Sequence, residues 1–548
     1  MYQWLRQKME EAGRYSRTIS PIDSKHVARW VWRKTLGLAQ PNHNLKAEPS
    51  SNKLLLRANY ISRDCWDGRS FSFGEEKHVW EGDWEANGTP STFWLEHLHS
   101  FHWLRQDSVD LQDGLAWMLH WSKAHKNGSG WGSIPTAVRV VNWMRFFIEH
   151  NHFDQALEQS LFVQADCLHR NLERESSAHC LWESAKALLL VGYYFNGSKA
   201  RAWRKDAGDM LAKQLERQFL SDGGHDQRSL MLQSLFIEDL LDLLSMLPEQ
   251  EVLLPRIERM VLHALWFLSG MSHPDGGTCF FGDATQDVVP QPDEIFAYAR
   301  RLNLPYELPL KDACFLGTES GLYRLVAGDW TLFAKVGELG SDGLFGYTHA
   351  DTNAFELSWK THRVMIDSGC GYYIPDQEHL RMRSTKAHNT IEIDNCNSSE
   401  VWGKHRLGRR ARPLHTEFFP PEADENGTVA LESSHDGYKH LPGFPIHWRR
   451  FEVSEKGVRL LDRVHGAGVH RLRGFYHFPT TEFSLDNDEG CITFPFGKVN
   501  IHVPDHLLQA KITRFWPSLG HAEPGVVIWW DLEEAELPRE IETRIWIS

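Results

Sequence analysis

The sequence lacks a long uninterrupted apolar run. No stretch reaches the roughly 20 apolar residues that a membrane-spanning helix requires. The first residues, MYQWLRQKMEEAGRYSR, also lack the apolar segment of a secretory signal peptide. We therefore expect no membrane span and predict a cytoplasmic location. With 41% hydrophobic and 24% charged residues, the composition is that of a globular protein.

Cysteine is scarce and shows no pattern. The 8 cysteines are scattered along the chain without paired spacing, which argues against a disulfide framework. Reduced thiols are expected instead, most of them buried as small hydrophobic side chains.

Positive charge is in deficit. The formal net charge of -14 argues against nucleic acid as a partner, because phosphate binding depends on clustered Lys and Arg. The basic run KHRLGRRAR, residues 404–412, is an exception: it either holds an anionic sugar or is a solvated strand edge. Tryptophan is abundant, with 23 residues; indole faces stack on sugar rings, although many of these side chains must belong to the core.

The first 300 or so residues show the helical spacing of apolar side chains, three and four residues apart. About eight helices are expected. They cover residues 93–106, 111–125, 135–150, 153–173, 183–195, 200–219, 234–247 and 256–271. The spacing alone does not distinguish a helical bundle from a helical toroid.

From about residue 315 the pattern changes to short alternating or apolar runs, which predict strands. These runs cover 321–337, 354–369, 389–395, 457–466, 471–479 and 526–532. An antiparallel β-sandwich packed against the helical half is expected, with the segment 301–315 as the junction. The predicted domains are an N-terminal extension (1–60), a helical domain (61–305) and a β-sandwich (306–548).

Two imidazoles and a carboxylate stand on three neighbouring runs of the second half. His349, Asp367 and His388 offer the nitrogen and oxygen donors that suit zinc. Three protein ligands would leave one position for water or a neighbouring group. The alternative is that these are ordinary strand residues joined by hydrogen bonds.

The segments around these residues resemble a known family. GYTHADTNAFELSWKTHRVMIDSGCGYY, RSTKAHNTIEIDN and SEVWGKHRLGRRARP are similar to the heparinase II/III-like family of polysaccharide lyases. In the helical half, FWLEHLHSFHWL, GWGSIPTAVRVVNWMRFF, HCLWESAKALLL and DGGHDQRSLMLQSLFIEDLLDLL extend the resemblance to about residues 90–480. It implies an incomplete α/α toroid followed by an antiparallel β-sandwich. It also implies a zinc ion at His349, Asp367 and His388, which either is structural or acts on substrate.

The resemblance further implies β-elimination on a uronic-acid polysaccharide, with a base that removes a proton and an acid that protonates the leaving oxygen. The catalytic positions, however, are substituted. His179 and Cys180 stand where the family has Asn-His upstream of the glutamate that matches Glu183, and Leu232 and Tyr347 stand where it has a catalytic Tyr and His. A one-residue gap would instead place His179 at the family His. Leucine cannot transfer a proton, so Tyr347 and His179 are the predicted catalytic residues, aided by nearby arginines or the metal.

Seven residues are predicted to bind substrate. Arg139 and Asn142 match a family signature at the start of one expected helix, and packing is the alternative explanation. Trp402 and Arg406 would place a stacking ring beside a guanidinium, a suitable arrangement for a uronate. The remaining three are Glu183, Arg228 and Arg383; for Glu183, a buried ion pair is the alternative.

Three functions stay open, each with a polysaccharide or oligosaccharide as partner. The first is a lyase with an altered catalytic set, acting on an acidic or bacterial surface polysaccharide such as an exopolysaccharide or lipopolysaccharide. The second is a catalytically silent carbohydrate-binding or polysaccharide-biosynthesis protein. The third is a hydrolase or transferase that uses carboxylates such as Glu183 and Asp351. The sequence does not indicate an oligomeric state.

Overall fold

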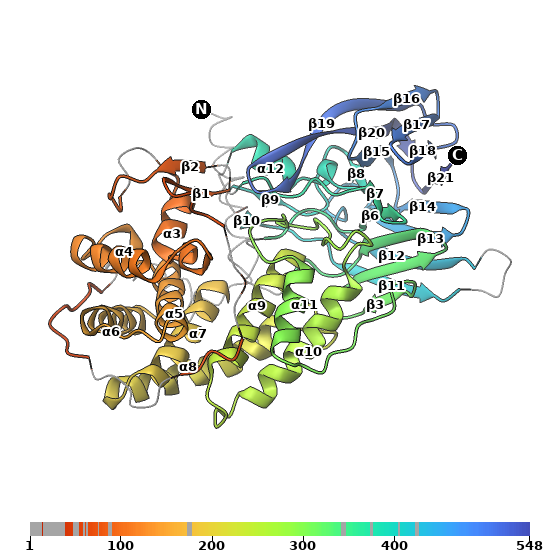
Figure 1. The fold of residues 1–548 in the computed structure, drawn as a ribbon. Coiled ribbons are helices and arrows are strands. Elements are labelled where there is room, and N and C mark those ends of the chain that lie inside the picture. Colours follow the sequence, from red (N-terminus) through yellow and green to blue (C-terminus); the bar gives the residue numbers. More distant parts are fainter. Residues whose placement is uncertain are drawn as a thin grey trace.

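The computed structural model shows a helical half beside a β half (Figure 1). It describes residue 14 and the ranges 39–47, 54–58, 61, 64–74, 76–85, 90–172, 178–340, 347–372, 376–403, 406–421 and 427–548. Most of the predicted extension over 1–60 lies outside these residues. Within the described residues, no helix is long and apolar enough to cross a bilayer.

The helical half contains every segment that the sequence predicted to be helical. Its helices are α3 (Thr92–Ser100), α4 (Leu111–Ala124), α5 (Ser133–Glu149), α6 (Gln155–Arg170), α7 (Ala178–Tyr194), α8 (Gly197–Gln218), α9 (Leu230–Met246), α10 (Leu254–Gly270) and α11 (Pro292–Arg301). A hairpin of β1 (Ser70–Phe73) and β2 (Glu76–Val79) precedes them. The sequence missed α11, a helix of only 10 residues with charged side chains in its first and last turns.

The predicted segment 93–106 is two helices. Phe101 has a φ of 57° and ends α3, and a short 3₁₀ helix, His102–Arg105, follows. The left-handed backbone at Phe101 interrupts the α-helical hydrogen bonds, which apolar spacing alone cannot reveal.

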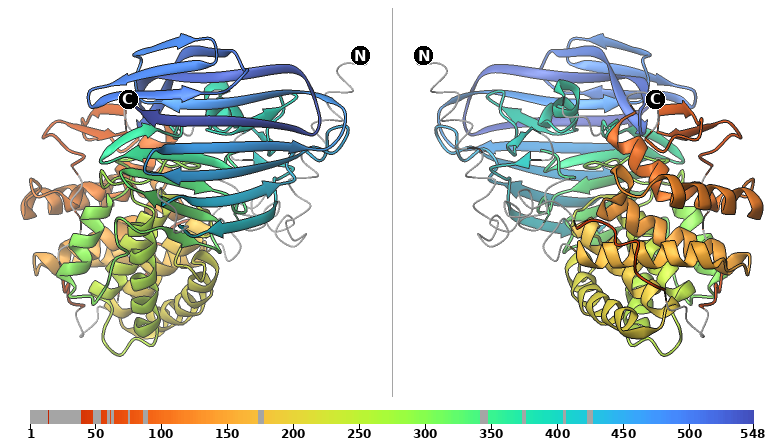
Figure 2. Two further views of the ribbon diagram at one scale, coloured as in Figure 1. Left: turned by 90° about the vertical axis from the view of Figure 1, so that its right-hand side faces the viewer. Right: turned by 90° about the vertical axis from the view of Figure 1, so that its left-hand side faces the viewer.

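The β half is built from antiparallel sheets, whose strands lie one above another in the left view of Figure 2. A five-stranded sheet has the order β3 (Phe315–Gly317), β4 (Leu322–Ala327), β5 (Trp330–Lys335), β6 (Ala354–Trp359), β7 (His362–Met365). An eight-stranded sheet has the order β11 (Pro413–Phe419), β12 (Val429–His435), β13 (Ile446–Ser454), β14 (Gly457–His465), β21 (Arg539–Ile547), β18 (Gly497–His502), β17 (Glu489–Phe494), β16 (Phe483–Asp486). A four-stranded sheet has the order β19 (Leu508–Ser518), β20 (His521–Glu536), β15 (Val469–Phe478), β8 (Ile391–Ile393).

The predicted strands are present as β4 to β8, β14, β15 and β20. The sequence missed β1 to β3, β9 (Val401–Trp402), β10 (Arg406–Leu407), β11 to β13, β16 to β19 and β21. In β11, β16, β19 and β21 the exposed positions carry many polar residues. It also missed α12 (Gln377–Met382), a short helix inside the β half.

Polar contacts join the two halves. The chain changes from helix to strand between Arg301, the end of α11, and Phe315, the start of β3. His273, after α10, bonds Ser358 and Glu356 on β6 at 2.7 and 2.8 Å. These contacts are fully buried and therefore orient the halves relative to each other.

Two buried histidines of the helical half are expected to destabilise the folded protein at acid pH. Burial lowers the pKa of His99 to about 2 and that of His225 to about 3, so both are neutral in the folded protein. In the unfolded chain they titrate near 6.5. Above about pH 6.5 these histidines do not change the free energy of unfolding. Below about pH 6.5 the unfolded chain takes up protons that the folded protein does not, so each histidine lowers the free energy of unfolding by about 1.4 kcal/mol per pH unit.

The measurement is urea unfolding at about pH 7.5 and about pH 5.5. His225→Gln should make the free energy of unfolding less dependent on pH. His521→Gln, at an exposed position, serves as the control, and an equal effect of both variants would contradict the prediction.

Candidate functional site

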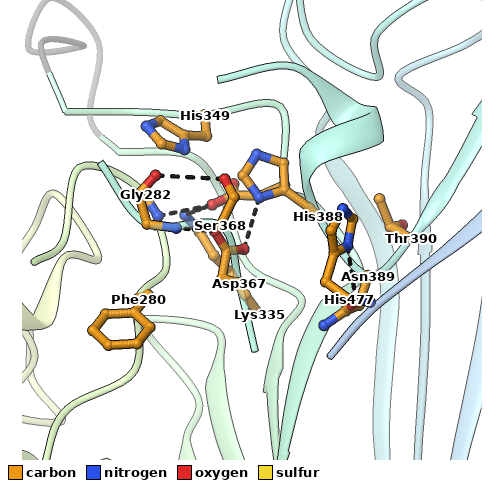
Figure 3. A network of polar contacts seen from close by, with 12 residues as sticks. Phe280, Gly282, Lys335, His349, Asp367, Ser368, His388, Asn389, Thr390 and His477 are labelled. Atoms are coloured by element: carbon orange, nitrogen blue, oxygen red, sulfur yellow. Dashed lines mark hydrogen bonds and ion pairs between the residues drawn. The ribbon is translucent and has the colours of Figure 1, made fainter. Parts of the chain in front are cut away.

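His349, Asp367 and His388 converge at one buried point (Figure 3). His349 precedes β6, Asp367 follows β7, and His388 follows the 3₁₀ turn Thr385–Ala387. One donor atom from each lies within 4.8 Å of the others. The structure therefore brings together three residues that the sequence singled out, in an arrangement chemically suited to a divalent metal.

The hydrogen bonds in this cluster orient both imidazoles. His388 Nδ1 lies 2.7 Å from Asp367 Oδ2, and His349 Nε2 lies 2.7 Å from an oxygen of Asp283. The other ring nitrogens, His349 Nδ1 and His388 Nε2, are buried without a hydrogen-bond partner among the described residues. A histidine whose second nitrogen is held by a carboxylate is the usual arrangement around protein-bound zinc.

Burial sets the protonation of the cluster. It lowers the pKa of His349 to about 4 and raises that of Asp367 to about 6. At neutral pH the imidazole is uncharged and the carboxyl is ionised, which are the forms that bind metal.

Asp351 is a further buried carboxylate close to this cluster. Its Oδ2 accepts hydrogen bonds from Lys335 Nζ at 2.6 Å and from the Gly282 amide at 3.1 Å. Burial alone would raise the pKa of Asp351. Lys335 and the two histidines outweigh this effect and hold the pKa of Asp351 below its usual range. Asp351 is therefore a fixed negative charge beside His349 and His388.

His179 lies in the first turn of α7, and its side chain is 22% exposed. Its Nε2 is 3.6 Å from Glu183 Oε1, one turn further along the helix. Glu183 is buried and pairs with Lys186 at 2.9 Å, and Lys186 also bonds Asp239. Glu183 thus orients the imidazole of His179, and the buried carboxylate of Glu183 is not accessible to a ligand.

Tyr347 packs against apolar side chains from the helical half. Leu232, which the sequence comparison predicted at the family's catalytic Tyr position, is 2% exposed and belongs to this group. The full group is Met231, Leu232, Ala284 and Val289. Burial raises the pKa of Tyr347 well above its usual range, and Asp283 and Cys180 reinforce the shift. His179 also adjoins α9, because its ring centroid lies 6.3 Å from that of Phe236, so both predicted catalytic residues lie against this helix.

Two family models match this chain. The model for the heparinase II/III N-terminus matches residues 94–291, and the model for the heparinase II/III-like C-terminal domain matches residues 311–520. The chain belongs to the heparinase II/III-like family. The chain is similar to a heparin-sulfate lyase from Bacteroides stercoris, with 22% identity over 339 residues, 57% of this chain and 47% of that protein. The chain therefore spans about half the length of that relative.

Solved structures share the fold of this heparinase II/III-like protein. A heparinase III has a TM-score of 0.67 at 16% identity and covers 85% of this chain and 79% of its own. A heparan sulfate lyase from Pedobacter heparinus has a TM-score of 0.59 at 16% identity, covering 87% and 81%. A chondroitin AC lyase from Streptomyces coelicolor A3 has a TM-score of 0.52 at 11% identity, covering 83% and 74%. The predicted fold, an incomplete α/α toroid followed by an antiparallel β-sandwich, is confirmed.

Trp402 and Arg406 pair in this heparinase II/III-like chain as the sequence suggested. They stand opposite each other on β9 (Val401–Trp402) and β10 (Arg406–Leu407), with the guanidinium carbon 4.8 Å from the ring centroid. Both side chains are half-buried. The predicted ligand Arg383 is instead fully buried and donates to the carbonyls of Thr348 and Arg406. It therefore anchors the segment that carries His349.

Three other predicted substrate-binding residues have packing roles in the structure. Arg139 is fully buried over Trp121, at 3.9 Å from the ring centroid, and donates to Gln164 and to backbone carbonyls. Asn142 is buried and bonded to Arg105 and to a backbone carbonyl. Arg228, with a φ of 52°, donates to Asp226 and reaches across to the Ser320 carbonyl at 3.4 Å. The sequence identified the residue types but could not show that their polar atoms are consumed internally.

Sequence reasoning missed Asp283 at the site. It lies in the loop between α10 and α11, in the sequence FGDAT, without a helical or strand pattern around it. Figure 3 shows its neighbour Gly282 beside His349. A turn glycine before an acidic residue was the only signal, and that pattern is common in ordinary loops.

Proposed function

We propose that this protein is a polysaccharide lyase with an altered catalytic set, which acts on an acidic polysaccharide by β-elimination. The observation that carries the proposal is that two side chains able to transfer a proton, His179 and Tyr347, both lie against α9. In this assignment His179 is the base, because it is partly exposed and oriented by Glu183. Tyr347 is the acid, because it keeps its proton at neutral pH.

The reaction removes the proton beside the uronate carboxylate and expels the glycosidic oxygen. His179 Nε2 takes the carbon-bound proton, and the Tyr347 hydroxyl delivers a proton to the leaving oxygen. The new carbon–carbon double bond is the product's distinguishing feature. The Arg406–Trp402 pair supplies a cation and an aromatic face for an anionic sugar.

We also propose that His349, Asp367 and His388 hold zinc. Their burial, their donor set and the two partnerless ring nitrogens support this assignment. When bound, zinc would provide a fixed positive charge and join three segments of the β half. Asp283 keeps His349 in the tautomer that leaves Nδ1 available.

The function is tested with a panel of uronate and bacterial surface polysaccharides, following ultraviolet absorbance and reducing ends together. Elimination should raise both, because each cut creates an unsaturated sugar and a new reducing end. An increase in reducing ends without an increase in ultraviolet absorbance would show that the protein is a hydrolase and not a lyase. His179→Ala should abolish the absorbance, whereas His169→Ala, which removes another histidine paired to a carboxylate, should not.

One observation favours a second function, that of a catalytically silent carbohydrate-binding protein. Leu232 and Met231 bury an apolar surface where the family places its catalytic Tyr. In that case neither signal should change, while one glycan of the panel raises the melting temperature of the protein.

Removal of one metal ligand gives a direct test of the zinc site. His388→Ala should lower the zinc content of the purified protein by one ion per chain, because two remaining ligands bind zinc weakly. Elemental analysis after dialysis is the measurement. His502→Ala, which removes a half-exposed histidine paired with Asp488, should leave the content unchanged. Equal zinc in wild type and His388→Ala would refute the assignment.

A further inference from the structure

A second set of metal-binding side chains lies next to the first. Asp283, Cys370 and His379 each offer one donor atom, and these atoms lie within 4.8 Å of one another. All three side chains are fully buried. Asp283 also touches the first cluster, through the bond between its Oδ1 and His349 Nε2.

Two glycine turns bring Asp283 and Cys370 together. Gly282 has a φ of 69° and Gly369 a φ of 65°, and each immediately precedes one of these residues. A Cβ atom at Gly369 would lie 2.5 Å from a backbone oxygen, and one at Gly282 would lie 2.7 Å from another. The Cys370 amide then donates to the Ala284 carbonyl at 3.3 Å. The two segments are therefore held side by side by the backbone.

His379 reaches the same place from α12. Asp376 caps this helix by accepting from the His379 amide at 2.8 Å. At the other end of α12, Met382 Sδ accepts from the Gly371 amide at 3.2 Å. The helix is thus attached to the residue that follows Cys370, which directs the His379 side chain towards the thiol and the carboxylate.

We propose that Asp283, Cys370 and His379 form a second zinc site. A thiolate, an imidazole and a carboxylate are a zinc-type donor set, and three protein ligands complete a tetrahedron with one water. Ligand atoms of tetrahedral zinc lie about 3.3–3.8 Å apart for bonds of about 2.0–2.3 Å. The present spacing of the three donors requires only a small closure to reach that geometry.

Zinc uptake at this site releases one proton. Without metal, burial and the neighbouring Asp283 raise the pKa of the Cys370 thiol well above its usual range, so the sulfur carries hydrogen. Coordination breaks the S–H bond, forms the S–Zn bond and passes the proton to solvent. The thiolate and the carboxylate then balance the two positive charges of the ion, which leaves a neutral site in a buried position.

A third group offers a similar set of donors, with a glutamate in place of the aspartate, and is held by hydrogen bonds. In His273, Cys279 and Glu356 both imidazole nitrogens are occupied, Nδ1 by Ser358 at 2.7 Å and Nε2 by Glu356 at 2.8 Å. Glu356 also accepts from the Phe280 amide at 2.7 Å. A metal would have to displace these bonds, so Cys279 provides a matched control for Cys370.

The second site would join the two halves of the molecule. Asp283 belongs to the loop between α10 and α11, whereas Cys370 and His379 belong to the β half. This proposal does not depend on the lyase assignment, because a bound ion here would brace the structure whether or not the protein cleaves sugar.

The experiment is replacement of zinc by Co²⁺ in the full chain, followed by absorption spectroscopy. A thiolate bound to Co²⁺ gives an intense near-ultraviolet charge-transfer band, and the cluster of His349, Asp367 and His388 contains no sulfur to produce one. We expect this band in the wild type and in Cys279→Ser, and its loss in Cys370→Ser. His379→Gln should weaken cobalt binding several-fold while leaving the cysteine in place.

Zinc stoichiometry provides the second measurement. Wild type dialysed from Zn²⁺ should retain two ions per chain, and Cys370→Ser one. No thiolate band in cobalt-loaded wild type, or a band that persists in Cys370→Ser, would overturn the proposal. Absence of the band in wild type overturns the proposal even if a variant fails to fold.

Discussion

Replacing Tyr347 by phenylalanine is expected to lower the rate of unsaturated-product formation by about 100-fold to 10,000-fold. Phenylalanine keeps the ring that packs against Leu232 and its apolar neighbours but cannot donate a proton to the leaving oxygen. The loss should therefore affect the rate of product formation, while the melting temperature stays close to that of wild type. Ultraviolet absorbance at saturating substrate measures the rate, and thermal unfolding measures stability.

A matched control is available in the helical half. Tyr193 donates its hydroxyl to Glu251, away from the site, and Tyr193→Phe removes the same atom. It should leave the rate unchanged. If Tyr347→Phe retained the wild-type rate, Tyr347 could not be the acid, and the proton would have to come from another group.

Removal of Asp462 should produce the largest loss of stability, about 3–5 kcal/mol for Asp462→Ala. Asp462 is fully buried and accepts from Arg449 at 2.6 and 2.9 Å and from His447 at 2.7 Å. Burial alone would raise the pKa of Asp462. Arg449 and His447 outweigh this effect and hold the pKa of Asp462 below its usual range. Without the carboxylate, a buried guanidinium would lack its counterion.

This pair also supports the functional site. Arg449 Nη1 donates to the carbonyls of Asn353 and Asn389, each at 2.8 Å, and Asn389 follows His388. Asp462→Ala should therefore weaken zinc retention as well as lower the free energy of unfolding measured in urea. Asp462→Asn keeps the shape of the side chain and should be less damaging.

The control is an ion pair at the surface of the sheet. Arg471 and Asp531 form a bidentate pair, but Arg471 is 35% exposed. Asp531→Ala should cost less than about 1 kcal/mol, because water screens the pair. Equal losses for Asp462→Ala and Asp531→Ala would show that burial does not determine the effect.

The apolar spacing of the sequence predicted most secondary structure. α9 is buried along nearly its whole length, and β4 and β5 are buried on both faces, so apolar residues predominate in all three. β11 was not predicted, because four of its seven residues are exposed. Its polar residues and isolated apolar residues do not form the alternation that indicates a strand. Such strands gain their place from hydrogen bonding to a neighbour, which local sequence does not record.

The cluster proposed to bind zinc was predictable from residue type and from the family resemblance. His349, Asp367 and His388 lie within 40 residues or so of one another, on segments that adjoin β6, β7 and β8. Asp283 was not predictable, because it comes from the helical half and reaches His349 only after the two halves pack. Arg139 shows the opposite case: its family signature is intact, yet its guanidinium is buried over Trp121.

By itself, the sequence determined the change from a helical half to a β half, the family, and the residue types available for metal binding and proton transfer. The tertiary structure alone decided which of these side chains meet. It buried Arg139, Asn142 and Arg383 within protein contacts, left His179 partly exposed, and placed Cys370 and His379 beside Asp283. The physical reason is that periodicity records which face of a segment is apolar, whereas the meeting of distant loops depends on turns and backbone hydrogen bonds that form only in the folded chain.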